Sequence, residues 1–145
     1  MKKIFVVLFI IFIGLFLFSC ESENNIVSIE DDNIFDTEVS KNSPRITKEN
    51  GNFAYILKGD EYTGSNSESL VYGKKNVVLT INVEKYKKGS CSVIIRSDYN
   101  NVLYTENING NIIYSKGHEF EDYPEQIYIE TKNFDGNIKI ALVEK

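Results

Sequence analysis

The stretch VVLTINVEKYKKGSCSVIIR, residues 77–96, decides the fold class. Its apolar residues occupy every second position in two runs, which contain Val77, Leu79, Ile81 and Val83 and then Cys91, Val93 and Ile95. Successive side chains of an extended chain point to opposite sides, so this alternation predicts strands with one buried and one polar face. Lys87-Lys88-Gly89 lies between the two runs and predicts a short hairpin that joins them.

The same alternation recurs on both sides of this stretch, in Phe53, Tyr55 and Leu57, in Ile127 and Ile129, and in Ile138, Ile140 and Leu142. Less regular strands are predicted at 70–72, 102–106 and 112–114, and turn signals stand at Asn109-Gly110 and Asp135-Gly136. Short strands separated by turns every eight to twelve residues are typical of an antiparallel sandwich or barrel. We therefore expect an all-β chain with a single antiparallel β-sandwich of about eight strands over residues 49–145.

The N-terminus has the layout of an export signal. Lys2 and Lys3 precede an apolar run over residues 4–18, which Ser19 and Cys20 follow. As a helix this run is about 22 Å long, short of the roughly 30 Å hydrocarbon core, which favours a cleaved signal peptide over residues 1–19. An ordinary signal peptide with a chance cysteine is the alternative.

Residues 17–20, Leu-Phe-Ser-Cys, resemble the lipobox of bacterial lipoproteins. The resemblance implies that a diacylglyceryl group is attached to the Cys20 thiol and that the chain is cut just before it. Acyl chains on Cys20 would hold the mature protein on a membrane, since each buried methylene contributes about 0.8 kcal/mol. We therefore expect a protein of the bacterial cell envelope, anchored to a membrane and facing outside the cytoplasm.

Residues 20–48 are predicted to form an acidic, flexible tether. Without Lys2 and Lys3 the chain has 14 basic and 21 acidic residues, a net charge of −7, and residues 21–50 account for −5 of it. This stretch has few periodic apolar residues to offset its ordering entropy. Alternatively, Ile26, Val27, Ile29, Ile34 and Phe35 form a short strand or helix that docks on the domain. The acidic balance excludes a basic face for nucleic acid.

Residues 74–145 resemble the C-terminal β-sandwich of small bacterial envelope lipoproteins, similar in layout to jelly-roll carbohydrate-binding modules. The resemblance rests on Lys88-Gly89-Ser90 opening a strand, on the turn into a strand over 98–104, and on residues 128–140 with Gly136 before a closing strand. It implies a jelly-roll-like architecture and no particular activity.

The residues that could carry chemistry are few. Cys91 has no partner for an intramolecular disulfide if Cys20 is lipidated, and its apolar stripe predicts a buried structural thiol. His118, the only histidine, is predicted to lie in a solvated loop near Glu119, Glu121 and Asp122. A zinc site needs three or four ligands and a hydrolytic triad needs a positioned nucleophile, so we expect no catalytic residue, metal or cofactor.

Three alternatives to the expectation of no catalytic residue and no metal stay open. His118 with the nearby carboxylates could serve a small envelope enzyme or an enzyme accessory domain. Carboxylates in predicted loops, at Asp60-Glu61, Asp98 and residues 119–122, could bind Ca²⁺. A glycosidase would need two carboxylates that face each other across a cleft, which a sequence does not reveal.

Tyrosines are the most suggestive surface feature, in turns or on predicted outer faces at Tyr62, Tyr72, Tyr86, Tyr99, Tyr104, Tyr114, Tyr123 and Tyr128. Exposed aromatic rings stack on sugars or fill a partner's pocket. Tyr99, Tyr104 and Tyr128 are our predicted binding residues. The favoured function is a non-catalytic, membrane-anchored lipoprotein that binds an envelope protein or glycan, with an aromatic patch and no deep polar pocket.

Overall fold

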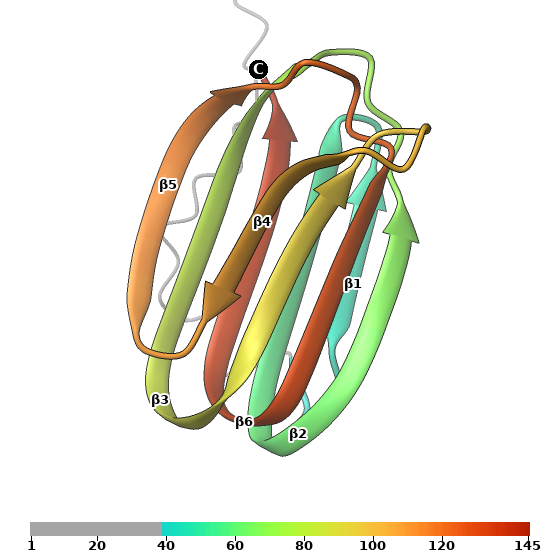
Figure 1. Ribbon diagram of the computed structural model, residues 1–145. Helices are drawn as coiled ribbons and strands as arrows, with labels where there is room; N and C mark the ends of the chain where they lie inside the picture. The colour runs from blue at the N-terminus through green and yellow to red at the C-terminus, as the bar shows by residue number, and fades with distance from the viewer. Residues whose placement is uncertain (1–38) are drawn as a thin grey trace, which may run out of the picture. The chain divides into compact units, whose positions relative to one another are not determined.

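The computed structural model describes residues 39–145, and its regular structure is entirely β (Figure 1). The strands are β1 (Arg45–Glu49), β2 (Asn52–Ser69), β3 (Asn76–Arg96), β4 (Val102–Ile108), β5 (Ile112–Glu119) and β6 (Gln126–Glu144). They form one antiparallel sheet in the order β1-β2-β6-β3-β4, and β5 also pairs with β3. The predicted all-β antiparallel class is confirmed.

The signal peptide, Cys20 and the acidic tether up to residue 38 lie outside the described residues. Within residues 39–145 no helix is long and apolar enough to cross a membrane. The first strand, β1, begins at Arg45, four residues before the predicted start of the domain at residue 49.

The sheet bends over on itself, so that three long strands run through two layers (Figure 1). Residues 76–84 of β3 pair with β5 and with the second half of β6, and residues 88–96 pair with β4 and with the first half of β6. We call layer I the part that contains β1, β5, 52–59 of β2, 76–84 of β3 and 136–144 of β6. Layer II contains β4, 62–69 of β2, 88–96 of β3 and 126–134 of β6.

Each long strand bends at a residue with positive φ. These residues are Glu61 in β2 (φ 55°), Lys85 in β3 (φ 53°) and Asn133 in β6 (φ 51°). The pairing register shifts at the bends of β2 and β3. A residue in the left-handed region leaves the extended conformation, and a bulge increases the local twist and bends the strand. The bends thereby carry the strands from one layer to the other without ending them.

Two predicted turns are wrong for this reason. Lys87-Lys88-Gly89 is not a hairpin, because both runs of the opening stretch belong to β3. Likewise Asp135-Gly136 lies inside β6 rather than between two strands. β6 pairs with β3 on both sides of the bend, so the chain crosses between layers where a reversal was expected. The structure therefore has six strands rather than about eight.

Other local predictions have mixed outcomes. Asn109-Gly110 does separate β4 from β5, and β4 follows the turn predicted before it. No strand forms at 70–72, although Leu70 and Tyr72 are buried. The Tyr72 hydroxyl donates a hydrogen bond of 2.5 Å to the carbonyl oxygen of Leu142, so this connection is fixed by a side chain rather than by sheet pairing.

The core fills the space between the two layers and consists of the predicted stripes. Val77, Leu79, Ile81, Val83, Cys91, Val93 and Ile95 are all buried, as are Phe53, Tyr55, Leu57, Ile127, Ile129, Ile138, Ile140 and Leu142. The sequence alternation thus identifies the inner face of both layers correctly. The other face of each layer points away from this core.

Candidate functional site

The outer faces of the two layers differ in exposure. On layer I, the central residues Ile56, Asn137, Lys139 and Ala141 are buried. On layer II, the corresponding rows contain Ser65, Ser67 and Ser69 of β2, Gln126 of β6 and Thr105 and Asn107 of β4, all of them exposed. Within the described residues, the open sheet surface is therefore that of layer II.

Tyr128 lies near the middle of this open surface. It pairs with Ser67 of β2 on one side and with Ile94 of β3 on the other, and Ile94 pairs with Thr105 of β4. Directly opposed residues share a face of a sheet, and the neighbours Ile127 and Ile129 are core residues. Tyr128 and its partners therefore point outward.

The rows on either side of Tyr128 are polar except for Val102. We call the whole surface the layer II face: Ser65, Ser67, Ser69, Ser92, Ile94, Arg96, Val102, Thr105, Asn107, Gln126, Tyr128 and Glu130. Gln126 donates a hydrogen bond of 3.0 Å from Nε2 to the Ser67 hydroxyl. The face thus surrounds one aromatic ring with hydroxyl, amide and charged groups.

Arg96 lies at the end of the layer II face next to the β3–β4 turn. Its Nη1 donates a hydrogen bond of 2.6 Å to Oδ1 of Asn100, while its Nε is buried without a hydrogen-bond partner. Tyr99 in the same turn is 77% exposed. Backbone hydrogen bonds of 3.0 Å between Ser97 and Asn101 and between Asn100 and Ser97 fix the turn. This corner therefore contains an exposed tyrosine ring and a guanidinium group whose Nε makes no hydrogen bond.

Tyr104 lies elsewhere, facing the space between the layers at the side where β4 and β5 form the two rims. Its ring meets that of His118 edge-on, with centroids 5.2 Å apart, and its hydroxyl donates to Glu106 at 3.1 Å. Burial, followed by the Glu106 carboxylate, raises the pKa of Tyr104 above its ordinary range. Of the three predicted tyrosines, Tyr128 belongs to the layer II face, Tyr99 lies in the exposed β3–β4 turn, and Tyr104 points between the layers.

His118 belongs to β5, and its predicted place in a solvated loop is wrong. Its Nε2 is 2.8 Å from the Tyr114 hydroxyl, and its ring stacks on Phe120 with centroids 5.6 Å apart. Burial and then the nearby Lys116 ammonium lower the pKa of His118, which favours the neutral imidazole. Because successive side chains of β5 point to opposite sides, the His118 side chain points inward, where aromatic rings rather than water surround it.

The carboxylates named with His118 do not join it. Among the described residues no hydrogen bond or ion pair links His118 to Glu119, Glu121 or Asp122. In residues 39–145 no group of three or more His, Cys, Asp or Glu side chains could hold a metal ion. Cys91 is buried, as predicted, and burial raises the pKa of its thiol to about 12, so it is protonated and unreactive at neutral pH.

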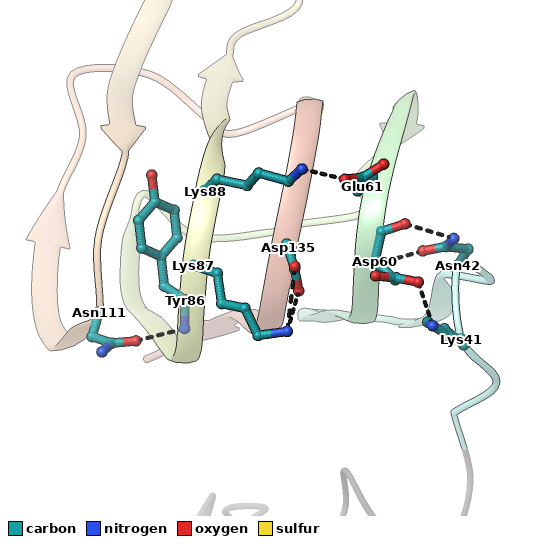
Figure 2. A network of polar contacts seen from close by, with 9 residues as sticks. All are labelled: Lys41, Asn42, Asp60, Glu61, Tyr86, Lys87, Lys88, Asn111 and Asp135. Atoms are coloured by element: carbon teal, nitrogen blue, oxygen red, sulfur yellow. Dashed lines mark hydrogen bonds and ion pairs between the residues drawn. The ribbon is translucent and has the colours of Figure 1, made fainter.

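A network of ion pairs holds the end of the sandwich where the strands bend. Figure 2 shows Lys88 reaching from β3 across β6 to Glu61 on β2, and Lys87 lies 3.3 Å from both oxygens of Asp135. Lys41 pairs with Asp60. Because each of these three ammonium groups meets a carboxylate, the network neutralises its own charge.

The same end of the molecule carries two shallow grooves. One, of about 530 Å³, is lined by Val83, Glu84, Lys85, Asn111, Ile112 and Ile113. The other, of about 230 Å³, lies beside the ion pairs, between Lys58, Lys87 and the backbone of Gly136. Asp60 and Asp135 also line the second groove, and each of these carboxylates is paired with a lysine.

Sequence reasoning missed Arg96, Gln126 and Ser67 as members of the face. Gln126, Tyr128 and Glu130 alternate with the core residues Ile127 and Ile129. This spacing alone could have placed Gln126 and Glu130 on the same face as Tyr128. The neighbours on β2 and β3 depend on strand pairing across more than 30 residues, which the alternation does not encode.

No family model matches the chain, and no curated protein matches it. Among solved structures, it is similar to the crystal structure of the enzymatically active domain of tailspike protein 4 from bacteriophage CBA120. The likeness has a TM-score of 0.37 and 13% sequence identity, and it covers 74% of this chain and 18% of the tailspike chain. The chain thus spans about a fifth of that protein's length, and a likeness this weak carries no argument about activity.

Proposed function

We propose that this protein is a lipid-anchored, extracytoplasmic binding module whose layer II face binds a glycan and catalyses no reaction. The observation that carries the proposal is Tyr128, an outward ring at the centre of the open sheet face. Its neighbours supply short hydrogen-bonding groups, including the Ser67 hydroxyl and the Gln126 amide. Lipid on Cys20, proposed from the lipobox resemblance, would keep this face in the envelope.

The chemistry of the face suits a sugar better than an apolar protein partner. A sugar ring presents C–H groups to an aromatic ring and hydroxyls to surrounding polar groups. The layer II face provides this combination, and Arg96 adds a guanidinium group at its end, whose Nη1 donates to Asn100. The serine-rich rows on β2 offer hydroxyls but little apolar area for a protein interface.

The test is glycan binding by the full mature protein and its variants. Bacterial cell-wall and capsular oligosaccharides on an array identify a ligand, and titration calorimetry then compares Tyr128→Ala with the wild type. Loss of one stacking ring should weaken binding at least tenfold, equivalent to about 1.4 kcal/mol. Arg96→Ala should weaken it as well.

Tyr123→Ala is the matched control, because Tyr123 is an exposed tyrosine in the β5–β6 connection, outside the layer II face. It should bind like the wild type. Equal binding by Tyr128→Ala and the wild type would exclude the layer II face as the site. Hydrolysis of the bound oligosaccharide that is abolished in His118→Ala would instead support the enzyme alternative.

The anchor has its own test. The intact mass of the protein purified from a bacterial membrane should correspond to a chain that begins at Cys20 with attached diacylglycerol. Cys20→Ser should abolish the added mass and release the protein from the membrane fraction. A retained N-terminal segment or an unmodified residue 20 would refute the lipoprotein assignment without bearing on glycan binding.

A further inference from the structure

Lys139 has an unusual position for a lysine. It lies in β6 on the outer face of layer I, in register with Ile56 on β2 and Asn82 on β3, and it is 5% exposed. A lysine on an uncovered sheet face extends its ammonium into water, and lysines are almost never fully buried unless paired. The burial of Lys139 therefore indicates that another part of a chain covers this face.

The burial extends over neighbouring residues of the same face. Asn137 and Ala141, on either side of Lys139 along β6, and Ile56 are also buried. Val39, the first described residue, packs against Ile56 in a small apolar cluster separate from the main core. The beginning of the described chain therefore lies on this face.

The face also has an excess of positive charge. Arg45 on β1 pairs in register with Ile56, which pairs with Lys139, and Lys58 lies one row away. Each of these three cations has an interaction partner. Glu84 is the acid beside them in the sheet, where its Oε1 accepts a hydrogen bond of 2.9 Å from Asn82, and Asp60 is paired with Lys41. Of the three, Lys139 is buried, Lys58 is half-buried and Arg45 is exposed. A buried ammonium is stable only beside negative charge.

We propose that the segment 32–38, Asp-Asn-Ile-Phe-Asp-Thr-Glu, is the cover of the layer I outer face. It contains three acids, Asp32, Asp36 and Glu38, that can meet Lys139 and the cations beside it, and in an extended chain Ile34 lies on the same side as these acids, where it can cover Ile56. Seven extended residues span about 23 Å, close to the width of five strands spaced about 4.8 Å apart. Because the segment is continuous with Val39, its effective concentration at the face is in the millimolar range.

The test is the chemical reactivity of Lys139 in the full chain. Wild-type protein is treated with an acetylating reagent, and the modification of Lys139 is compared with that of exposed Lys74 by mass spectrometry. We expect Lys139 to react at least tenfold more slowly than Lys74. The variant Asp32→Lys/Asp36→Lys/Glu38→Lys should raise the Lys139 rate at least tenfold.

Glu21→Lys/Glu23→Lys/Glu30→Lys is the matched control, with the same three charge reversals outside the segment. It should leave Lys139 protected. Protection that persists in the first variant would overturn the proposal, as would protection that is lost on dilution together with a dimer, because a second copy would then be the cover. Hydrogen exchange of the wild type adds a readout that needs no variant: amides 33–38 should be protected, and free exchange there would refute docking. Neither readout involves a glycan, so the outcome is independent of the proposed function.

Discussion

At the scale of single residues, Tyr72 shows how one side chain replaces a missing strand. The segment 70–75 between β2 and β3 is not paired in the sheet, and the buried Tyr72 hydroxyl donates to the Leu142 carbonyl across the molecule. Tyr72→Phe keeps the ring but leaves that carbonyl without this donor. Loss of one buried hydrogen bond costs about 0.5–1.5 kcal/mol, so the free energy of unfolding should fall by this amount in urea denaturation.

Tyr123→Phe is the control for this prediction, because Tyr123 is exposed and its ring lies under the Lys75 ammonium, 5.2 Å from the centroid. Removing its hydroxyl should change the free energy of unfolding by less than about 0.5 kcal/mol. Equal destabilisation by the two substitutions would show that the Tyr72 hydrogen bond contributes nothing specific.

At the scale of elements, the bend of β3 depends on Gly89. Gly89 has φ 88°, and a Cβ there would lie 2.6 Å from the carbonyl oxygen of Lys132 and closer still to the carbonyl group of Asn133. Gly89→Ala therefore combines an unfavourable φ with a clash against the backbone of β6. It should cost about 3 kcal/mol or more of unfolding free energy, measured by thermal or urea denaturation.

Gly110→Ala provides the comparison, since a Cβ at Gly110 would meet no atom within 4 Å. This variant in the β4–β5 turn should unfold within about 1 kcal/mol of the wild type. If Gly89→Ala proved as stable as Gly110→Ala, the close approach of β3 and β6 at the bend would be wrong.

At this scale the sequence predicts the buried faces of the strands but not their bends. Alternation is a local property, so the buried faces of Val77–Val83 and Ile138–Leu142 follow from it directly. A left-handed Lys85 or Glu61 is not local in this sense, because neither residue type favours positive φ. Turn residues such as Lys88-Gly89 indicate where the direction changes, but pairing with β6 decides whether the chain reverses or crosses to the other layer.

At the scale of the whole molecule, the two outer faces differ in exposure. Layer II presents Tyr128 among polar side chains, and layer I buries Lys139 under what we propose to be the segment before Val39. The tyrosine prediction found Tyr128 because its alternation with isoleucine is local. The same prediction grouped Tyr104 with Tyr128, because the sequence does not show which strand forms the rim of which layer.

The rim formed by β4 and β5 joins the layers through His118, and its titration reports on that contact. Burial and Lys116 on β5 lower the pKa of His118, while Tyr104 faces it from β4 with its hydroxyl on Glu106, and the Tyr114 hydroxyl is hydrogen-bonded to it on its own strand. As the only histidine, His118 gives a single resolved imidazole signal in NMR, and its pKa should lie below the ordinary 6.5. The unfolded chain then binds more protons than the folded chain below about pH 6.5, so stability should fall as the pH drops through this range. Lys116→Ala should raise the pKa of His118 and flatten that loss, whereas an unchanged titration curve would show that the ammonium is too well solvated to act on the imidazole.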